Sequence, residues 1–410
     1  MDTISIKTFK HKKTQVIDGY YVVHYTQLLM KILAVPQSEF ELFSIKKIIF
    51  SIHIMAVISL SVWSIVFRSL YAYFNVKDFD EQIIVMTPVI FIFVILIKYF
   101  IILYRHKEIN QSIEYIKKDW KRITSQERKS FMIENARISN QLSFLIIVLM
   151  YTSGMFYNVV MPLILPIVFK TNTHSNTSER LPIFPGYDVV FDAKISPVYE
   201  ITYVFFICAV IVVFSTITLM YILTIVLVSH VRGQVQIIIN LLKLLKNNIK
   251  DEKTLLIRMS NLIRHHMRAL AFSNHIRKTL YELCFVDLWA SAIFFCLDEY
   301  CFLKMLDQND FINMIPYAML FISLNFNILI MCYSSELLDS QFVEIGKETY
   351  KTEWYRFSVK IRTYLILIIS ISQRSQKITA GGIVELSYAT YLSIIKTGFA
   401  YMQILRAADM

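Results

Sequence analysis

Long apolar runs separated by polar, mostly basic stretches form the dominant pattern along this chain of 410 residues. A helix rises ~1.5 Å per residue, so about 20 apolar residues cross the ~30 Å hydrocarbon core of a bilayer. Seven runs are suited to spanning, and they lie at about 47–70, 83–104, 141–169, 200–229, 282–303, 312–335 and 384–406. The pattern predicts an all-α polytopic membrane protein with seven transmembrane helices.

Shorter amphipathic segments between the runs predict helices outside the membrane. The basic N-terminal segment contains an apolar face ahead of Pro36, which favours an interfacial helix. The stretch 364–372 is apolar over only nine residues, too few to cross a bilayer, so we expect a buried helix in a cytoplasmic bundle. The predicted division is a cytoplasmic or interfacial segment (1–46), spans one to six (47–335, with the cytoplasmic loop 230–282), cytoplasmic anchor helices (336–380) and the last span (381–410).

Composition agrees with this class, and the placement of charge predicts an orientation. Hydrophobic residues make up 56% of the chain and charged residues 18%, and the mean hydropathy is +0.50, far above that of a soluble domain. The net charge of +11 would suit nucleic acid, but 33 Lys and Arg residues lie in the N-terminal segment and alternate loops, against five in the remaining loops. The positive-inside rule therefore places the N-terminus in the cytoplasm and the C-terminus outside, and no nucleic-acid partner is expected.

Two shorter features concern processing of the chain. No apolar core follows the N-terminal lysines until Ile48, so we expect no cleavable signal peptide. The Asn176-Thr-Ser sequon falls in the second predicted outer loop, where a glycan would be attached.

No group of residues has the pattern of a catalytic or metal site. The five cysteines lie in or beside apolar runs without metal-ligand spacing, so we expect no enzyme, no metal and no cofactor. His265 and His266 are adjacent and point ~100° apart on a helix, which favours a solvated basic face. Asp298 and Glu299 lie near the outer end of the fifth span, where we expect contact with water or a vestibule that attracts cations.

Lys396 is the ionisable residue that we expect deepest in a span, about 18 Å along the last helix from Glu385. A charge at that depth faces protein or water and has a partner. We expect Asp298 as that partner, with Asp287 as the second choice. The alternative is that the lysine side chain snorkels along the helix toward the interface.

One narrow sector of the last span carries small and hydroxylated residues, namely Thr390, Ser393, Thr397 and Ala400, followed by Ile404. Two interpretations stay open from these residues alone. Small residues let membrane helices pack closely. They also suit the wall of a water-filled path, in which Ile404 would form an apolar constriction.

Two short motifs bring in a family resemblance. The first is Glu385-Leu-Ser-Tyr, followed by the run from Tyr391 to Tyr401 and by Ile404-Leu405, and the second is Tyr350-Lys-Thr-Glu-Trp-Tyr. Both resemble motifs of insect odorant receptors, and the pattern of spans and loops fits over nearly the whole chain. The resemblance implies an odorant-specific subunit of a ligand-gated, non-selective cation channel in the plasma membrane of olfactory neurons, assembled with a co-receptor, in a tetramer, through the cytoplasmic helices.

The same resemblance implies a pore along the last helix. Its lining would be Thr390, Ser393, Thr397 and Ala400, closed at the outer end by Ile404 together with Ala408. A gustatory receptor of the same superfamily is the alternative, but its Gln-Phe pair is replaced here by Thr397-Gly398. A metabotropic seven-helix receptor would need the reverse topology, a poorer fit.

A ligand site for a small volatile molecule calls for a mostly apolar cavity. The outer halves of spans two, three, four and six supply aromatic and methionine side chains for it, although such residues also serve simply in helix packing. The candidate ligand-binding residues are Ile84, Thr87, Phe91, Tyr151, Gly154, Met155, Asn158, Tyr199, Tyr203, Phe206, Tyr317 and Phe321.

Overall fold

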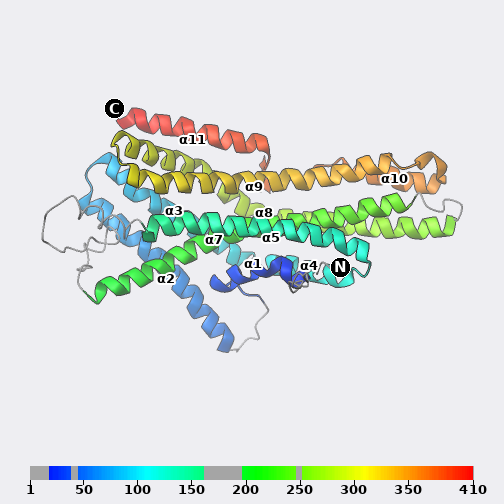
Figure 1. The fold of residues 1–410 in the computed structure, drawn as a ribbon, viewed down its shortest axis with the longest axis horizontal. Coiled ribbons are helices and arrows are strands. Elements are labelled where there is room, and N and C mark those ends of the chain that lie inside the picture. The colour runs from blue at the N-terminus through cyan, green and yellow to red at the C-terminus, as the bar shows by residue number, and fades with distance from the viewer. Residues whose placement is uncertain (1–17, 38–44, 161–195, 246–251, 410) are drawn as a thin grey trace, which may run out of the picture.

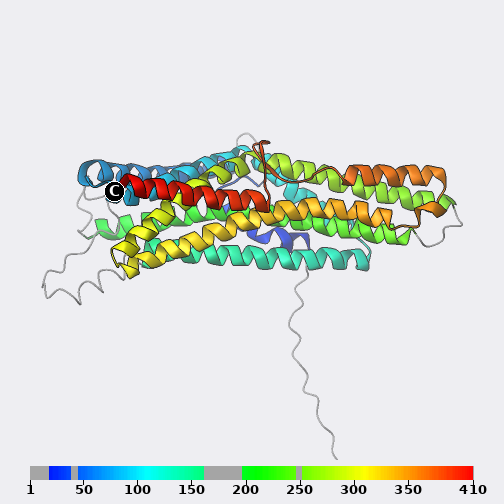
Figure 2. The ribbon, with the colours of Figure 1, turned by 90° about the horizontal axis from the view of Figure 1, so that it is seen from above.

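A computed structural model describes residues 18–37, 45–160, 196–245 and 252–409. The elements are α1 (Gly19–Ile32), α2 (Ile45–Asn75), α3 (Phe79–Tyr104), α4 (His106–Arg122), α5 (Gln126–Met155), the π-helical turn η1 (Phe156–Val160), α7 (Val198–Leu244), α8 (Glu252–Asp307), α9 (Phe311–Tyr350), the 3₁₀ turn η3 (Trp354–Arg356), α10 (Val359–Ser372), β1 (Thr379–Ala380), β2 (Val384–Glu385) and α11 (Tyr388–Asp409). Figures 1 and 2 show one elongated bundle, with α2, α3 and α11 toward one end and α10 at the other.

The expected all-α, multi-pass membrane architecture is confirmed. Within the described residues, six helices are long and apolar enough to cross a bilayer: α2, α3, α5 with η1, α7, α8 and α9. The run expected at 141–169 is described only as far as Val160. α11 spans 22 residues and is less apolar than these six, because polar residues occupy one of its sides.

α8 has 56 residues and therefore extends ~84 Å, far more than the hydrocarbon core requires. Its first half, the second half of α7 and the second half of α9 run on together beyond the apolar part, where α10 packs on α9 (Figure 1). We call this part the extension, residues 230–245, 252–281 and 337–378. In the described part of the loop 230–282, the helices are continuations of α7 and α8.

α10 is the short apolar stretch that we expected to be buried, and only one of its faces is. Ile361, Leu365 and Ile368 pack inward, but Ile366 and Leu367 are 66% and 53% exposed. α1 is the helix expected ahead of Pro36. The Asp18 carboxylate caps its first turn by accepting hydrogen bonds from the Tyr20 and Tyr21 amides, both at 3.0 Å.

α7 is the central helix of the bundle, since 94% of its most apolar stretch is buried against its neighbours. Its sequence allows this because its threonine hydroxyl groups are satisfied within the helix. Thr218 and Thr224 donate to the carbonyls of Phe214 and Met220, four residues earlier, at 2.6 and 3.0 Å.

The last span begins later than expected. Residues 379–385 form a short antiparallel hairpin of β1 and β2, and its turn needs Gly381 and Gly382 at φ +59° and +66°, in the left-handed region. Because a helix cannot continue through that turn, α11 starts only at Tyr388. The stretch from Gly381 to Glu385 therefore lies outside the last helix.

Candidate functional site

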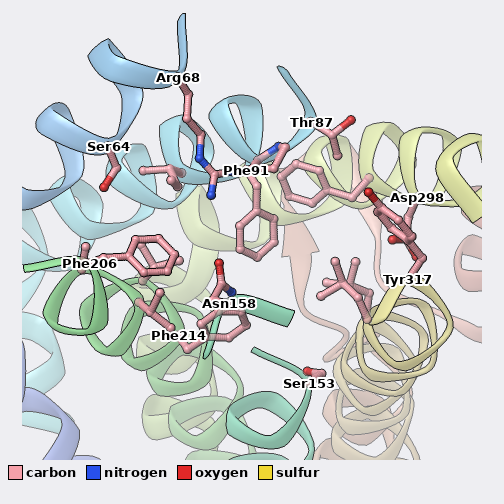
Figure 3. Close-up of a pocket in the computed structure, with 18 residues that line it drawn as sticks. Ser64, Arg68, Thr87, Phe91, Ser153, Asn158, Phe206, Phe214, Asp298 and Tyr317 are labelled. Atoms are coloured by element: carbon pink, nitrogen blue, oxygen red, sulfur yellow. The ribbon is translucent and has the colours of Figure 1, made fainter. Parts of the chain in front are cut away.

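A cavity of about 70 Å³ lies among α2, α3, α5, η1, α7, α8 and α9, toward the end of the bundle remote from the extension (Figure 3). That volume is several times the ~10–15 Å³ that one water molecule occupies by the same measure. The lining residues are Ser64, Arg68, Thr87, Pro88, Phe91, Ile92, Ser153, Asn158, Phe206, Ala209, Val210, Val213, Phe214, Phe294, Asp298, Tyr317, Leu320 and Leu324.

Aromatic rings form much of the wall because four helices, α3, α7, α8 and α9, present them to the same space. The Phe91 ring of α3 lies 6.1 Å from that of Phe214 on α7 and 5.0 Å from that of Phe294 on α8, measured between centroids. Tilted rings at these separations attract one another and leave irregular gaps that suit a small apolar molecule.

Most polar groups on the wall are already hydrogen-bonded to their own helix. Thr87 Oγ1 donates to the Ile83 carbonyl at 2.8 Å, Ser64 Oγ donates to the Leu60 carbonyl at 3.0 Å, and Asn158 Nδ2 donates to the Gly154 carbonyl at 2.8 Å. Asn158 lies on the π-helical turn η1, an irregularity that often occurs at functional sites. Two charged residues complete the wall, Arg68 at 6% and Asp298 at 2% exposure.

Five of the twelve residues expected to bind ligand lie together on this wall: Thr87, Phe91, Asn158, Phe206 and Tyr317. Gly154 lies directly behind it, because a Cβ atom at that position would come within 2.5 Å of the Phe214 ring.

The other six expected residues make contacts elsewhere. The hydroxyls of Tyr151 and Ser215 are hydrogen-bonded at 2.6 Å, and the Phe321 ring packs edge-on against Phe295 at 5.8 Å. Ile84 packs in a small cluster behind Tyr317, Met155 packs against the main core, and Tyr199 and Tyr203 are half-buried on α7.

The structure also adds lining residues that the sequence interpretation missed. Ala209, Val210 and Val213 continue the helical face that begins at Phe206, so the 3.6-residue period was an available signal. Arg68 is an ionisable side chain within the first apolar run, which by itself marks a functional position.

The expectation that Asp298 and Glu299 meet water is wrong for this chain. They are 2% and 7% exposed, because α8 is packed on several sides by α3, α7, α9 and α11. His266 is likewise buried, at 2% exposure, rather than part of a solvated face, since it points into the packed extension.

The expected pairing of Lys396 is also wrong. Its side chain is exposed on α11 and forms no ion pair with Asp298 or Asp287 in the described part of the chain. Asp287 pairs instead with Lys98 of α3, a buried lysine within the second span that sequence interpretation overlooked.

α11 has a buried side and a polar side. Ile394, Gly398 and Met402 are buried, and Gly398 approaches α8 so closely that a Cβ atom there would lie 2.8 Å from Phe295 Cβ. The polar sector lies on another side, with Thr390 and Thr397 half-buried and Ser393, Ala400 and Ile404 exposed in the single chain. Close packing within this chain thus uses Gly398 rather than the polar sector. The side chain of Ala408 and the sequon at Asn176 lie outside the described residues.

This arrangement defines a class: a multi-pass helical membrane protein with a mostly apolar cavity between its helices. The family model described as 7tm odorant receptor matches residues 78–399. The chain belongs to this odorant receptor family, as the two motifs indicated.

Relatives and solved structures agree with that assignment. Odorant receptor 83a of Drosophila melanogaster is 22% identical over 147 residues, which cover 36% of this chain and 32% of that protein. Odorant receptor 10 of Aedes albopictus is 23% identical over 156 residues, 38% and 41% of the two chains. The chain therefore spans less than half the length of these curated relatives. The insect olfactory receptor OR5 of Machilis hrabei, solved in complex with eugenol, superimposes with a TM-score of 0.75 at 13% identity, covering 96% of this chain and 100% of that one, a likeness of fold.

Proposed function

We propose that this chain is the odorant-specific subunit of a ligand-gated, non-selective cation channel that depolarises an olfactory neuron. The observation that carries the proposal is the cavity: it is mostly apolar and built from helices that all run through the membrane part of the bundle. A volatile organic molecule would bind there, in the outer half of the subunit. That eugenol is bound to the similarly folded OR5 supports a small organic ligand here.

Charge placement supports the orientation in this proposal. The basic loops 105–139, 230–280 and 344–378, where the structure describes them, lie on the side that carries the extension, which the positive-inside rule places in the cytoplasm. The cavity then lies toward the outer half of the subunit. The extension, together with the anchor residues 336–380, serves subunit contact. Seven crossings, with α11 as the last, leave the C-terminus outside.

α8 offers a short physical link between the cavity and α11. Phe294 lines the cavity, whereas the next residue, Phe295, packs against Gly398 of α11. A ligand that preferred one position of Phe294 would therefore also bias the position of α11. Each tenfold preference for the open state contributes ~1.4 kcal/mol, so a modest difference in affinity shifts the gate.

The polar sector of α11 would line the shared path in the assembled channel. Thr390, Ser393, Thr397 and Ala400 provide a wettable surface, and Ile404 at 63% exposure would form the outer constriction together with Ala408. No acidic side chain lies on this sector, which fits weak selection among cations. In this proposal the partner subunit is an odorant co-receptor, and whether odorant-evoked currents require it is the test.

The test expresses the chain with and without an insect odorant co-receptor and applies a panel of volatile molecules while recording current. Odorant-evoked cation current only in the co-expressing cells is expected. Current from this chain alone would favour the gustatory type of channel, and no response to any volatile would overturn the proposal.

Cysteine substitutions test the path itself. Charged thiol reagents should change the current through cysteines at Ser393, Thr397 and Ile404. Leu392 and Phe399 are the matched controls, since they are also exposed but lie off the polar sector, and modification there should leave the current unchanged. The reverse pattern would exclude this sector as the path. An epitope tag after Met410, stained on intact cells, tests the orientation.

A further inference from the structure

One side chain on the cavity wall has no partner. The Asp298 carboxylate is 2% exposed, and neither of its oxygens accepts a hydrogen bond from any residue that the structure describes. Figure 3 shows it beside Tyr317 on the α8–α9 side of the cavity, across from Arg68 of α2. Asp298 and Arg68 form no ion pair with each other.

An unpartnered carboxylate is unusual in so apolar a place. Buried polar groups in native proteins nearly always have hydrogen-bond partners, because leaving one unmatched is unfavourable. Three donors on the same wall, the hydroxyls of Thr87 and Ser64 and the amide of Asn158, donate to carbonyls of their own helices. They therefore do not satisfy Asp298. The missing partner must therefore come from whatever occupies the cavity.

The chemistry of that occupant follows from the wall. Most of the surface is aromatic and aliphatic, which selects an apolar body. The oxygens of an unpartnered carboxyl group accept hydrogen bonds, so a ligand that brings a donor supplies the missing partner, and a hydrogen bond to a charged acceptor is stronger than one between neutral groups. A hydroxyl or an amine at one end of a small apolar molecule meets both requirements, whereas an ether or a hydrocarbon does not.

We propose that Asp298 determines ligand specificity by accepting a hydrogen bond from a hydroxyl or amine group of an otherwise apolar odorant. This inference rests on the proposed function, because it takes the cavity as the site at which the odorant acts. It goes further by naming the ligand class and the residue that selects it.

The experiment compares matched ligands on the chain co-expressed with the co-receptor. Benzyl alcohol and benzyl methyl ether form one pair and 1-hexanol and hexyl methyl ether another, with benzylamine and hexylamine as the arm that separates a charged donor from a neutral one. The unsubstituted channel should respond to the alcohol or amine at concentrations about tenfold or more below those needed for the ether.

Two substitutions at Asp298 then remove different properties. Asp298→Leu removes the acceptor, and the alcohol-to-ether preference should fall to within about threefold. Asp298→Asn keeps the shape and one acceptor oxygen but removes the charge, so the amine should lose more sensitivity than the alcohol. The Asn variant also serves if the Leu variant fails to reach the cell surface.

Glu299→Gln is the matched control, because Glu299 is the adjacent buried acid and does not line the cavity. It should leave the alcohol-to-ether ratio unchanged, and the ether response reports channel assembly in every variant. A channel that answers volatiles but shows no donor preference, or keeps it in Asp298→Leu, overturns this inference while the proposed function stands. A channel that answers no volatile at all overturns both.

Discussion

Lys98 of α3 and Asp287 of α8 form an ion pair inside the membrane part of the bundle, with side chains only 1% and 2% exposed. The Tyr221 hydroxyl of α7 lies 3.0 and 3.1 Å from the two oxygens of the same carboxylate and donates to it. Three helices far apart in sequence are therefore joined at one buried point. Each charge stabilises the other, since either one alone would be an unpaired charge in an apolar interior.

Removing one member of this pair should destabilise the protein strongly. We expect Lys98→Met or Asp287→Leu to lower the free energy of unfolding by about 3–5 kcal/mol, because each leaves a buried charge without its partner. The double substitution Lys98→Met with Asp287→Leu should recover most of the loss. Thermal unfolding of the purified protein in detergent measures all three.

The control for this cycle is Lys377→Met, whose partner Glu336 lies at a more exposed position, with side chains 23% and 27% exposed. Its effect should stay near 1 kcal/mol or below. If the double variant were as unstable as the sum of the two single variants, the two charges would not depend on each other.

A methyl group at Gly154 should reshape the cavity. In Gly154→Ala the new Cβ would lie 2.5 Å from the Phe214 ring, which must then turn or shift on the cavity wall. We expect responses to bulky odorants to weaken about tenfold relative to small ones, since about 1–2 kcal/mol of overpacking falls on the ligand space. Dose–response curves for a size series of one chemical class measure this.

Gly346→Ala is a suitable comparison, because the Cβ there would lie 3.2 Å from Ser372 Cβ in the extension, away from the cavity. It should change overall stability without changing the dependence on odorant size. An unchanged size dependence in Gly154→Ala would show that Phe214 does not limit the cavity.

The contact between α11 and α8 depends on the absence of a side chain at Gly398. Gly398→Ala would bring a Cβ atom to 2.8 Å from Phe295 Cβ, an atom next to the backbone that cannot turn away. We expect the helices to separate and the free energy of unfolding to fall by about 1–3 kcal/mol. Ala400→Ser, on an exposed side of the same helix, should change it by at most about 0.5 kcal/mol. Thermal unfolding of both variants provides the comparison, and equal effects would contradict close packing at Gly398.

Asp119 of α4 should make the stability of the protein sensitive to acid. Its carboxylate contacts Arg268 at 2.5 Å, Gln234 at 3.0 Å and His230 at 3.4 Å. Burial by itself would raise the pKa of Asp119, but the hydrogen bonds and charges of His230 and Arg268 outweigh it and hold the pKa below its ordinary value of 3.8. An acid whose pKa is lowered on folding stabilises the folded state above its ordinary pKa, and loses that contribution as the pH falls through the lowered value.

We therefore expect Asp119→Asn to lower stability at pH 7 by about 2 kcal/mol, less than for a fully buried pair because the Arg268 side chain is 31% exposed. The difference between the variant and the unsubstituted protein should shrink as the pH falls below about 4. Unfolding curves at pH 7 and pH 3 measure this. Glu114→Gln, from a pair in which both side chains are 65% exposed, should show neither effect, and a constant difference across the pH range for Asp119→Asn would contradict the role of its charge.

Much of the fold was predictable because hydrophobicity and length along the chain measure burial in a bilayer directly. The apolar runs lie within helices of the structure as far as it describes them, except for the start of the run at 384–406, where Val384 and Glu385 belong to β2. α4 is amphipathic, with Ile109, Ile113, Ile116 and Trp120 buried along one face. The motifs at Tyr350 and Glu385 were sufficient to indicate the family. Turns were harder to predict from the sequence, as the glycine turn that delays the start of α11 shows.

The sequence by itself determined which segments are helical, which enter the membrane, which family the chain belongs to and which sector of α11 is polar, because each is a property of neighbouring residues. Only the tertiary structure decided which faces meet. Lys98 and Asp287 are 189 residues apart in the chain, and no local period reveals that they pair or that Lys396 does not. Asp298 seemed exposed near a helix end, yet the helices around α8 enclose it, since burial depends on neighbours that the local sequence does not specify.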